Sequence, residues 1–549
     1  MAGATAAKGA STATCNAGSE SEKSCQLYVP SAHELGFDQE AFRQGKLSIV
    51  ILGATGDLAR KEIFPALLDL VAQRFLPEQV VLVGVGRSKR TSEEFRQQLK
   101  PALLEACPSQ ANACEGDVNA FLQKMSYCSL DYKSQEDFKG LQQFLEEVED
   151  AAFQSARKAD SLEQPALRNR VFYFAVPPFV FEDAASAIKE TCLTDSGFNR
   201  IILEKPFGRD LHTAEELSTA LKRLYTEDQL YRMDHFLGYE VCQNILSVRF
   251  RNAFVEPLMN NRHVAAVRIS LKEDFGTQGR GGYFTKYGNI RDVVQNHLLQ
   301  VLTLVALERP DGDLRAAKLE LLRAVRDINM DEVVVGQYVA GNDHPGFLED
   351  DSIAERDEEA AKRCPTFVQL VIRIDNDRWR GVPFIILAGK GLEESRCEVR
   401  IQFKETRSPD IFPGETCPRN ELVMRVSPHE AIYMRMNMKT PGLSGDLTQS
   451  ELDLCYNSQY GCTYRPRAYA RLLLEALRGH QDQFVGEDEL LRAWEIFTPL
   501  LEKLEGHACD KKLVKYPFGS QGPQQARDML PSLNFLEPEG PEGNACWKN

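Results

Sequence analysis

The stretch from residue 47 to residue 70 constrains the fold of this chain more than any other. Residues 47–52 form a short, mostly apolar run with two isoleucines and a valine, which suits a buried parallel strand. Gly53 and Gly56 follow, and glycine lets a backbone turn sharply and approach a ligand closely. Apolar residues at helical spacing come next, at 63, 64, 66, 67 and 70. A strand, a glycine turn and a helix in this order usually hold a dinucleotide, whose pyrophosphate lies against the amides that open the helix. The alternative is an ordinary turn between a strand and a helix.

A second strand-like run, residues 79–86, ends in basic residues. Arg87 follows Gly86 directly, with Lys89 and Arg90 beyond it. A site that prefers NAD usually places an acid here, which accepts hydrogen bonds from the ribose hydroxyls, whereas an arginine favours the 2′-phosphate of NADP. We therefore expect NADP as the cofactor. A solvated basic loop is the alternative.

Composition limits the class of protein. The chain has 549 residues, of which 43% are hydrophobic and 26% charged, as in soluble globular proteins with two or more domains. No run is apolar for long enough to span a bilayer, and the net charge of −15 argues against nucleic acid as a partner. We expect neither a membrane nor nucleic acid among its partners.

The cysteines and the N-terminus indicate the compartment. The 14 cysteines are scattered and form neither CxxC pairs nor the His/Cys spacing of a metal site. They include Cys15, Cys25, Cys107, Cys114, Cys128 and Cys192. The first 25 residues are rich in Ala, Gly, Ser and Thr and contain no arginine. We expect reduced thiols, no metal, a cytoplasmic location and a disordered leader over residues 1–45.

Two kinds of patterning divide the rest of the chain. Residues 46–235 alternate strand-like and helix-like runs, which predicts a Rossmann-like α/β domain with a parallel sheet that binds NADP. Residues 236–549 carry strand-like runs in series, which predicts an α+β domain with a large, mainly antiparallel sheet. The expected strands are 80–84, 170–176, 200–204, 264–273, 366–375, 382–390, 397–405, 421–426 and 431–439. The expected helices are 92–105, 135–156, 182–191, 289–306, 468–478 and 488–504.

Three segments place polar residues where chemistry is expected. Lys205 ends an apolar strand, and the ends of strands in such a sheet border the ligand crevice. Asp234 and His235 are adjacent in a largely apolar stretch. Asp292 and His297 lie in an otherwise apolar helix, where polar groups are costly to bury without partners. Taken singly, each has a simpler explanation, as a solvated lysine or as a histidine satisfied within the core.

Taken together, the segments resemble glucose-6-phosphate dehydrogenases over nearly the whole chain, from residue 47 to residue 547. The resemblance rests on Gly53-Ala-Thr-Gly-Asp-Leu-Ala59, Glu204-Lys-Pro-Phe-Gly208, Asp234-His235 and the segments 291–300, 381–390, 419–423, 451–454 and 496–501. It implies an enzyme that transfers a hydride from C1 of glucose 6-phosphate to NADP+. The products would be 6-phosphoglucono-1,5-lactone and NADPH, in the first step of the oxidative pentose phosphate pathway.

The resemblance also implies a role for each site residue. His297 matches the base that removes the proton of the C1 hydroxyl, and Asp234 matches the acid that orients this histidine. Lys205 matches a lysine between the coenzyme and the sugar. The acceptors of sugar hydroxyls are matched by Glu273 and Asp292, and the phosphate-binding positions by His235 and Lys390. The coenzyme positions are matched by Gly53, Thr55, Gly56, Asp57, Leu58 and Arg87.

Assembly and a second nucleotide are further implications of the resemblance. The family forms dimers and tetramers through its large sheet, so we expect a homodimer or homotetramer that assembles through residues 236–549. Animal members also bind a second, structural NADP. That site is matched in part by Arg396, Arg400, Arg419, Tyr433, Arg435, Asp453 and Trp547, while Leu387 and Gly486 fall where a basic residue is expected.

The chain departs from the family at its phosphate-binding motif. The family pattern reads Asp-His-Tyr-Leu-Gly-Lys, whereas here Phe236 replaces the tyrosine and Tyr239 replaces the lysine. A neutral phenol cannot supply the fixed charge of a lysine. A charge-assisted hydrogen bond is worth about 1.5–3 kcal/mol, so we expect weaker phosphate binding with the hydride chemistry intact. Two alternatives remain, namely a catalytically impaired homologue that acts as a ligand-binding or regulatory subunit, and an oxidoreductase of unphosphorylated aldoses.

Overall fold

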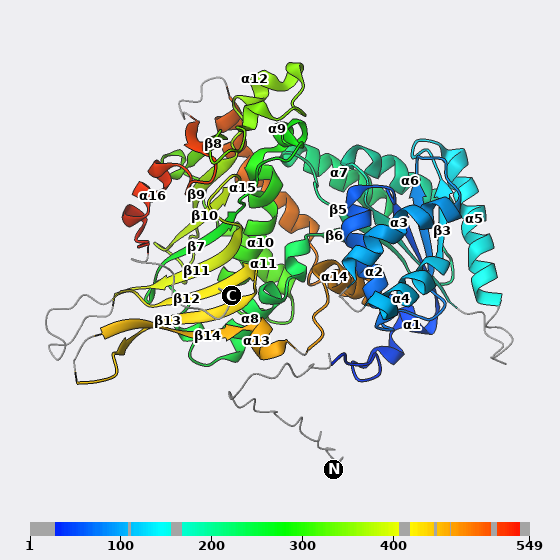
Figure 1. The fold of residues 1–549 in the computed structure, drawn as a ribbon, viewed down its shortest axis with the longest axis horizontal. Coiled ribbons are helices and arrows are strands. Elements are labelled where there is room, and N and C mark those ends of the chain that lie inside the picture. Colours follow the sequence, from blue (N-terminus) through cyan, green and yellow to red (C-terminus); the bar gives the residue numbers. More distant parts are fainter. Residues whose placement is uncertain are drawn as a thin grey trace, which may run out of the picture.

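The computed structural model describes residues 28–107, 111–154, 167–405, 418–443, 447–461, 463–506 and 513–537. Two sheets organise them. A parallel sheet from the N-terminal half lies on the right of Figure 1, and a larger sheet from the C-terminal half lies on the left. Both parts of the predicted fold class are therefore confirmed.

The N-terminal sheet has six parallel strands in the order β3-β2-β1-β4-β5-β6. Its strands are β1 (Lys46–Leu52), β2 (Val81–Gly86), β3 (Met125–Ser129), β4 (Arg168–Phe174), β5 (Asn199–Glu204) and β6 (Leu230–Met233). The direction in which strands are added reverses at β1. In such sheets ligands bind beyond the carboxyl ends of the strands at that point.

Helices cover both faces of this sheet because β1 is apolar on both sides. Ile49 and Ile51 are buried in one core cluster, with the side chains of α2, α3 and α4, whereas Val50 and Leu52 are buried in the other, with α5, α6 and α7. The bounds are α2 (Phe64–Ala72), α3 (Ser92–Ala106), α4 (Ala111–Gln123), α5 (Gln135–Gln154), α6 (Phe181–Thr191) and α7 (Leu211–Leu224).

Residues 28–45, the described segment before β1, have a defined structure. This segment contains a short 3₁₀ turn, Phe37–Gln39, and α1 (Ala41–Gln44). Phe37 and Phe42 are buried in the same cluster as Ile49 and Ile51. The prediction of a disordered leader is therefore wrong for residues 28–45, because its aromatic residues pack into the core. Residues 1–27 lie outside the described residues.

The C-terminal sheet has nine strands in the order β14-β13-β12-β11-β7-β10-β9-β8-β15. They are β7 (Val264–Lys272), β8 (Val334–Val339), β9 (Phe367–Arg373), β10 (Pro383–Gly389), β11 (Arg396–Phe403), β12 (Glu421–Ser427), β13 (Ala431–Lys439), β14 (Leu447–Cys455) and β15 (Val514–Pro517). The pairs β10–β7 and β15–β8 are parallel and the other pairs are antiparallel. The sheet is thus mainly antiparallel, as predicted.

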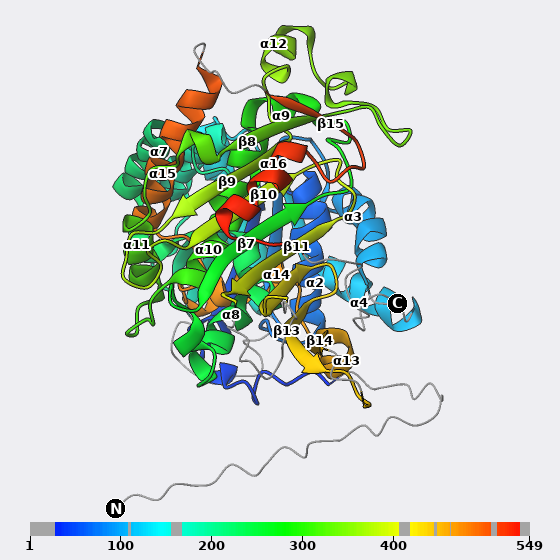
Figure 2. The same cartoon turned by 90° about the vertical axis from the view of Figure 1, so that its left-hand side faces the viewer.

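Helices fill the space between the two sheets and cover part of the outer face. Figure 1 shows α8 (Glu240–Arg251), α9 (Gly281–Asn289), α10 (Leu299–Ala306), α11 (Leu314–Arg323) and α15 (Glu487–Glu505) on the side of the large sheet that faces the N-terminal domain. Figure 2 shows α16 (Gln524–Met529) across the opposite face. The remaining helices are α12 (Glu358–Ala361), α13 (Tyr456–Tyr460) and α14 (Ala468–Arg478). No helix in the described part of the chain combines the length and apolar character of a membrane span.

Helix α14 belongs to the C-terminal half by sequence but packs on the N-terminal domain. Leu472, Leu473 and Leu477 are buried in the cluster that contains α2. This packing brings the segment before α14 close to the boundary between the domains, where Asp234 and His235 also lie.

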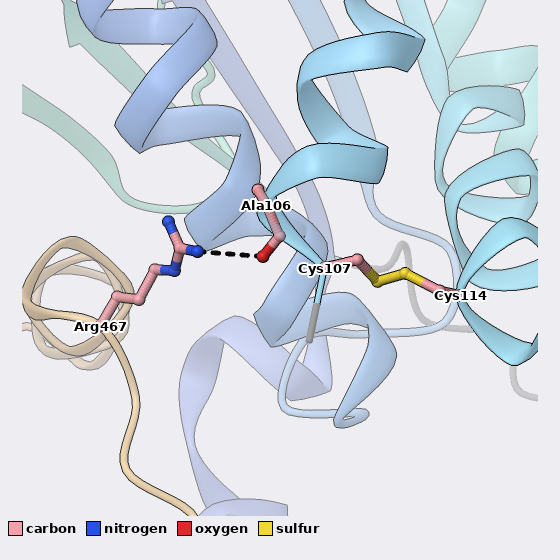
Figure 3. The surroundings of a disulfide bond; sticks show 4 residues. All are labelled: Ala106, Cys107, Cys114 and Arg467. Atoms are coloured by element: carbon pink, nitrogen blue, oxygen red, sulfur yellow. Dashed lines mark hydrogen bonds between the residues drawn. A yellow bond between two sulfur atoms is a disulfide. The ribbon is translucent and has the colours of Figure 1, made fainter. Parts of the chain in front are cut away.

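Two cysteines are joined, contrary to the prediction that all of them are reduced. Figure 3 shows a disulfide between Cys107, directly after α3, and Cys114 on α4, with Cα atoms 6.3 Å apart. The carbonyl of Ala106 beside it accepts a hydrogen bond of 3.0 Å from Arg467. Sequence spacing did not reveal the pair because two cysteines seven residues apart do not form a CxxC motif. Cys15 and Cys25 lie outside the described residues.

Candidate active site

The glycine turn at the carboxyl end of β1 has the geometry of a nucleotide-binding turn. Gly53 has a φ of +81°, and a Cβ there would lie 2.1 Å from the carbonyl oxygen of Ala175, so only glycine fits. Its amide donates to Val85 O on the neighbouring strand at 2.9 Å. The amide of Gly56 donates to Gly53 O at 2.8 Å, which closes the turn. A π-helical turn, Ala59–Ile63, then leads into α2.

The predicted coenzyme residues gather at one edge of the sheet. Because Leu52 on β1 pairs with Val85 on β2, the turn after β1 and Arg87 after β2 lie at neighbouring strand ends. Arg87 is exposed there, as are Thr55, Gly56 and Asp57, while Gly53 and Leu58 are partly buried. Asp57 pairs with Arg60 at 2.7 Å and Lys61 at 2.9 Å. The glycine turn after β1 suits a pyrophosphate. Because an arginine rather than an acid follows β2, the site suits NADP.

A buried Asp–His pair occupies the boundary between the domains. Asp234 follows β6, and its Oδ1 lies 2.6 Å from Nδ1 of His297. The two side chains are only 3% and 2% exposed. Oδ1 also accepts the amide of Phe236 at 3.0 Å, which fixes the carboxylate. With Nδ1 bound to the carboxylate, Nε2 of His297 is the nitrogen that can accept a proton.

His297 is carried by an unusual helix. The expected helix 289–306 consists of a π-helix, Ile290–Leu298, followed by α10, after a break at Gly288 with φ +62°. The side chain of Asn289 donates to Ala388 O at 3.1 Å, which ties the start of the π-helix to β10. In an α-helix, residues five apart lie about 140° apart around the axis, whereas the i→i+5 bonding of a π-helix brings them to one face. Asp292 and His297 therefore share a face.

The electrostatics give the pair the charge state of a general base. Burial disfavours the charge on Asp234, but its interactions with His297, His235 and Lys205 outweigh this and lower the pKa of Asp234 to about 2. Burial lowers the pKa of His297, and Asp234 opposes this shift only in part. At neutral pH the structure thus holds an ionised carboxylate against a neutral imidazole, which is the form that accepts a proton.

Aromatic rings enclose the histidine. Phe236 stacks on His297 with ring centroids 4.5 Å apart and planes 12° apart. His235 lies edge-on to His297 at 4.4 Å and stacks against Tyr469 at 5.8 Å. The structure therefore places Phe236, predicted as an altered phosphate position, beneath the histidine, where it contributes to the burial that keeps the imidazole neutral.

Four of the predicted substrate-binding residues form two ion pairs near the dyad. Nζ of Lys205 donates to the backbone carbonyl of Asp292 at 2.6 Å and lies 3.4 Å from its Oδ1. Nζ of Lys390 donates to Oε2 of Glu273 at 2.6 Å. Burial opposes ionisation of Asp292, but Lys205 and then Lys390 outweigh it and lower its pKa. The four residues thus offer paired donors and acceptors of the kind that sugar hydroxyls need.

A cavity of about 720 Å³ lies beside the dyad. His235 and Tyr239 line it, as does Tyr469 at the start of α14. Arg465 and Arg467, from the segment before α14, also line it. The sequence patterns did not single out these last three residues, because they come from a segment distant in sequence with no motif of its own.

The ligand atoms of Asp234, His235 and His297 lie within 4.8 Å of one another, a spacing that a metal ion can use. The short bond between Asp234 and His297 already occupies one ligand atom of each residue. Asp234 and His297 are thus held together as an acid–base pair, and His235 lies against the ring of His297.

Two family models match almost the whole described chain. The model described as "Glucose-6-phosphate dehydrogenase, NAD binding domain" matches residues 50–244, and the corresponding C-terminal domain model matches residues 246–535. The chain belongs to the glucose-6-phosphate dehydrogenase family.

Individual members of the glucose-6-phosphate dehydrogenase family resemble this chain over most of their length. "Glucose-6-phosphate 1-dehydrogenase 6, cytoplasmic" from Arabidopsis thaliana is 43% identical over 505 residues, covering 90% of this chain and 93% of its own. The glucose-6-phosphate 1-dehydrogenase of Takifugu rubripes is 41% identical and covers 94% of each chain. A solved glucose-6-phosphate dehydrogenase in complex with glucose-6-phosphate is 39% identical, with a TM-score of 0.81 over 90% of this chain and 99% of that chain.

The residues matched to the family's second, structural nucleotide lie mainly on β11, β13 and β14. Arg400 and Arg435 both pair with Glu421, at 2.7 and 3.1 Å. Gly486 does not belong with this group, because it caps α15, which packs on α7 and α11. Trp547 lies outside the described residues. A second bound NADP stays a prediction.

Proposed function

We propose that this protein oxidises glucose 6-phosphate to 6-phosphoglucono-1,5-lactone while NADP+ is reduced to NADPH. The observation that carries the proposal is the buried bond of 2.6 Å between Asp234 and His297 at the domain boundary. This bond leaves a neutral imidazole nitrogen for the C1 hydroxyl, beside the edge of the sheet where the coenzyme turn lies. The solved relative in complex with glucose-6-phosphate supports the choice of sugar.

The residues divide the chemistry between them. Nε2 of His297 takes the proton of the C1 hydroxyl, and Asp234 stabilises the imidazolium that forms. Lys205, held by Asp292, lies where it can donate to an oxygen of the sugar or coenzyme. NADP+, when bound at the glycine turn, supplies the acceptor for the hydride that leaves C1. Glu273 and Lys390 orient the sugar from the side of the large sheet.

The cellular location and the oligomeric state are proposed from the same family. The plant relatives are named as cytoplasmic isoforms, which supports a cytoplasmic enzyme. We expect a homodimer or homotetramer. The intact dyad favours an active enzyme over a catalytically impaired homologue or an aldose oxidoreductase.

Steady-state kinetics of the purified protein test the proposal. Production of NADPH should be far faster with glucose 6-phosphate and NADP+ than with glucose or NAD+. The double variant Asp234→Asn, His297→Asn serves as the control for contaminating activity. Wild-type protein that oxidises glucose 6-phosphate no faster than this control would overturn the proposal.

A further inference from the structure

The cavity beside the dyad must supply a positive charge if it holds a phosphate, and most cations near the dyad are already engaged. Lys390 is bound to Glu273 and Lys205 to Asp292. His235 brings no charge, because burial holds its pKa well below the usual range. The phenol of Tyr239 is neutral as well. His429 also lines the cavity, but the arginines in its wall are the side chains there that carry a permanent positive charge.

The contacts of Arg465 leave some of its N–H donors available to a ligand. Its side chain is 29% exposed, and its NH1 lies 3.5 Å from Glu430, a long ion pair. NH2 donates to Oδ1 of Asn457 at 2.7 Å. A guanidinium has five N–H donors in a planar fork that matches the oxygens of a phosphate, and these contacts use two of them. The remaining donors can reach an anion in the cavity.

Arg467 has a different task. Figure 3 shows its guanidinium extending to the end of α3, where it donates to Ala106 O at 3.0 Å. This contact joins the segment before α14 to the N-terminal domain. Arg467 therefore contributes to the positive potential of the cavity from its edge.

Three carboxyl groups also line the cavity, and each has a counter-charge. Glu240 pairs with Arg471, and Glu430 with Arg465. Burial raises the pKa of Glu62, with Arg467 opposing the shift. Burial raises the pKa of Glu430, Arg465 opposes this shift, and repulsion from Glu240 adds to it. A phosphate that displaces Glu430 from Arg465 therefore leaves behind a carboxyl that is readily protonated.

We propose that Arg465 binds the phosphate group of the substrate, in a subsite that it forms with His235 and Tyr239. The proposal rests on the function proposed above and adds the residue that distinguishes a phosphorylated from an unphosphorylated hexose. His235 both lines the cavity and touches the ring of His297, so a phosphate held there lies within the length of one hexose from the base.

Calorimetric titration of the full-length protein with glucose 6-phosphate, and separately with inorganic phosphate, measures this subsite without turnover. Arg465→Ala should weaken both by roughly 10- to 100-fold, the effect of losing a charge-assisted hydrogen bond. Arg465→Lys should retain part of the affinity, because it keeps the charge but not the fork. Activity with unphosphorylated glucose should not change.

Arg478→Ala is the matched control. Arg478 lies at the far end of α14, pairs with Glu40 at 3.0 Å and Glu475 at 2.9 Å, and does not line the cavity. Its loss should leave phosphate binding unchanged. The proposal fails if Arg465→Ala binds phosphate as tightly as this control, if it weakens glucose turnover as much as phosphate binding, or if wild-type protein binds no phosphate. Arg465-dependent phosphate binding without turnover would count against the proposed function and leave the subsite standing.

Discussion

At the residue scale, the decisive contact joins two side chains 63 positions apart, Asp234 and His297. Considered alone, His297 would be interpreted as a core residue. Its contact with Asp234 makes it a candidate base. His297→Asn should lower kcat by about 10²–10⁴-fold with little change in NADP+ binding, because general-base catalysis contributes that much. Steady-state kinetics with coenzyme binding as the control measure this. A variant that keeps most of its kcat would show that His297 has a structural role only.

The pH profile should report the same histidine. His297 acts when neutral, and burial lowers its pKa, so kcat/KM should persist below pH 6.5 and fall only as the pH drops through the lowered value. Since Asp234 raises the pKa of His297, Asp234→Asn should move this acid limb to still lower pH while reducing kcat. A limb that moves to higher pH in this variant would contradict the assignment.

Coenzyme choice depends on Arg87. Arg87→Ala should raise KM for NADP+ far more than KM for NAD+, because only NADP carries the 2′-phosphate that an arginine at this position binds. Equal effects on the two coenzymes would show that Arg87 belongs to a solvated loop.

Tyr239 offers a gain-of-function test of the cavity. Tyr239→Lys should lower KM for glucose 6-phosphate by adding a cation beside His235 and Arg465, and the gain should shrink as salt rises. Unphosphorylated glucose is the control and should show no gain. An unchanged or higher KM for glucose 6-phosphate would mean that the lysine pairs with Glu62 or Glu430 instead.

At the element scale, the turn after β1 tolerates no side chain at Gly53. Gly53→Ala should lower the free energy of unfolding by more than the roughly 1–2 kcal/mol of a left-handed conformation, because the new Cβ also meets the carbonyl of Ala175. Gly140 on α5 is the matched control, since its Cβ would meet nothing within 4 Å. Gly140→Ala should stabilise the helix by about 0.5–1 kcal/mol. Denaturant titration compares the two, and equal effects would show that the turn relaxes.

The long, strongly patterned elements could be predicted from the sequence. Residues 431–439 and 468–478 match β13 and α14 at both ends, because alternation and helical spacing are strong there. The edge strands β14 and β15 were missed, since β14 is rich in polar residues and mostly only partly buried, and β15 has only four residues. The π-helix could not be predicted, because its residues keep helical spacing and the bonding pattern depends on the break at Gly288 and on how Asn289 meets β10.

Site residues that lie in contiguous motifs could be predicted from the sequence. Those that distant segments bring to the site were missed. Asp234, His297 and the glycine turn were identified from local patterns or family resemblance. Tyr469 and Arg465 reach the cavity only because α14 crosses to the other domain, which no local pattern reveals. The stacking of Phe236 on His297 could not be predicted for a similar reason, since it depends on the packing of two separate helices.

At the scale of the whole molecule, contacts between distant segments hold the two halves in register. Tyr464, just before α14, donates to Asp69 on α2 at 2.6 Å. Burial raises the pKa of Asp69, and the Tyr464 hydrogen bond opposes the shift. Tyr464→Phe should therefore cost about 1–3 kcal/mol where Asp69 is ionised. The loss should shrink at low pH. Because the pKa of Asp69 is raised in the folded state, Asp69 becomes protonated there and its buried charge no longer needs the hydrogen bond from Tyr464. Unfolding at pH 8 and pH 5 tests this, and a loss that grows toward low pH would contradict it.

The seam, meaning the interface between the two halves, also passes through the active site. One family model ends at residue 244 and the next begins at residue 246, so Asp234 and His297 belong to different modules that must dock before either can work. An inherited change anywhere along the seam, from α2 to α14, can separate the acid from its histidine while leaving both intact. In an activity assay of natural variants, such a change would lower activity as a substitution in the active site does, although it lies far from any substrate atom.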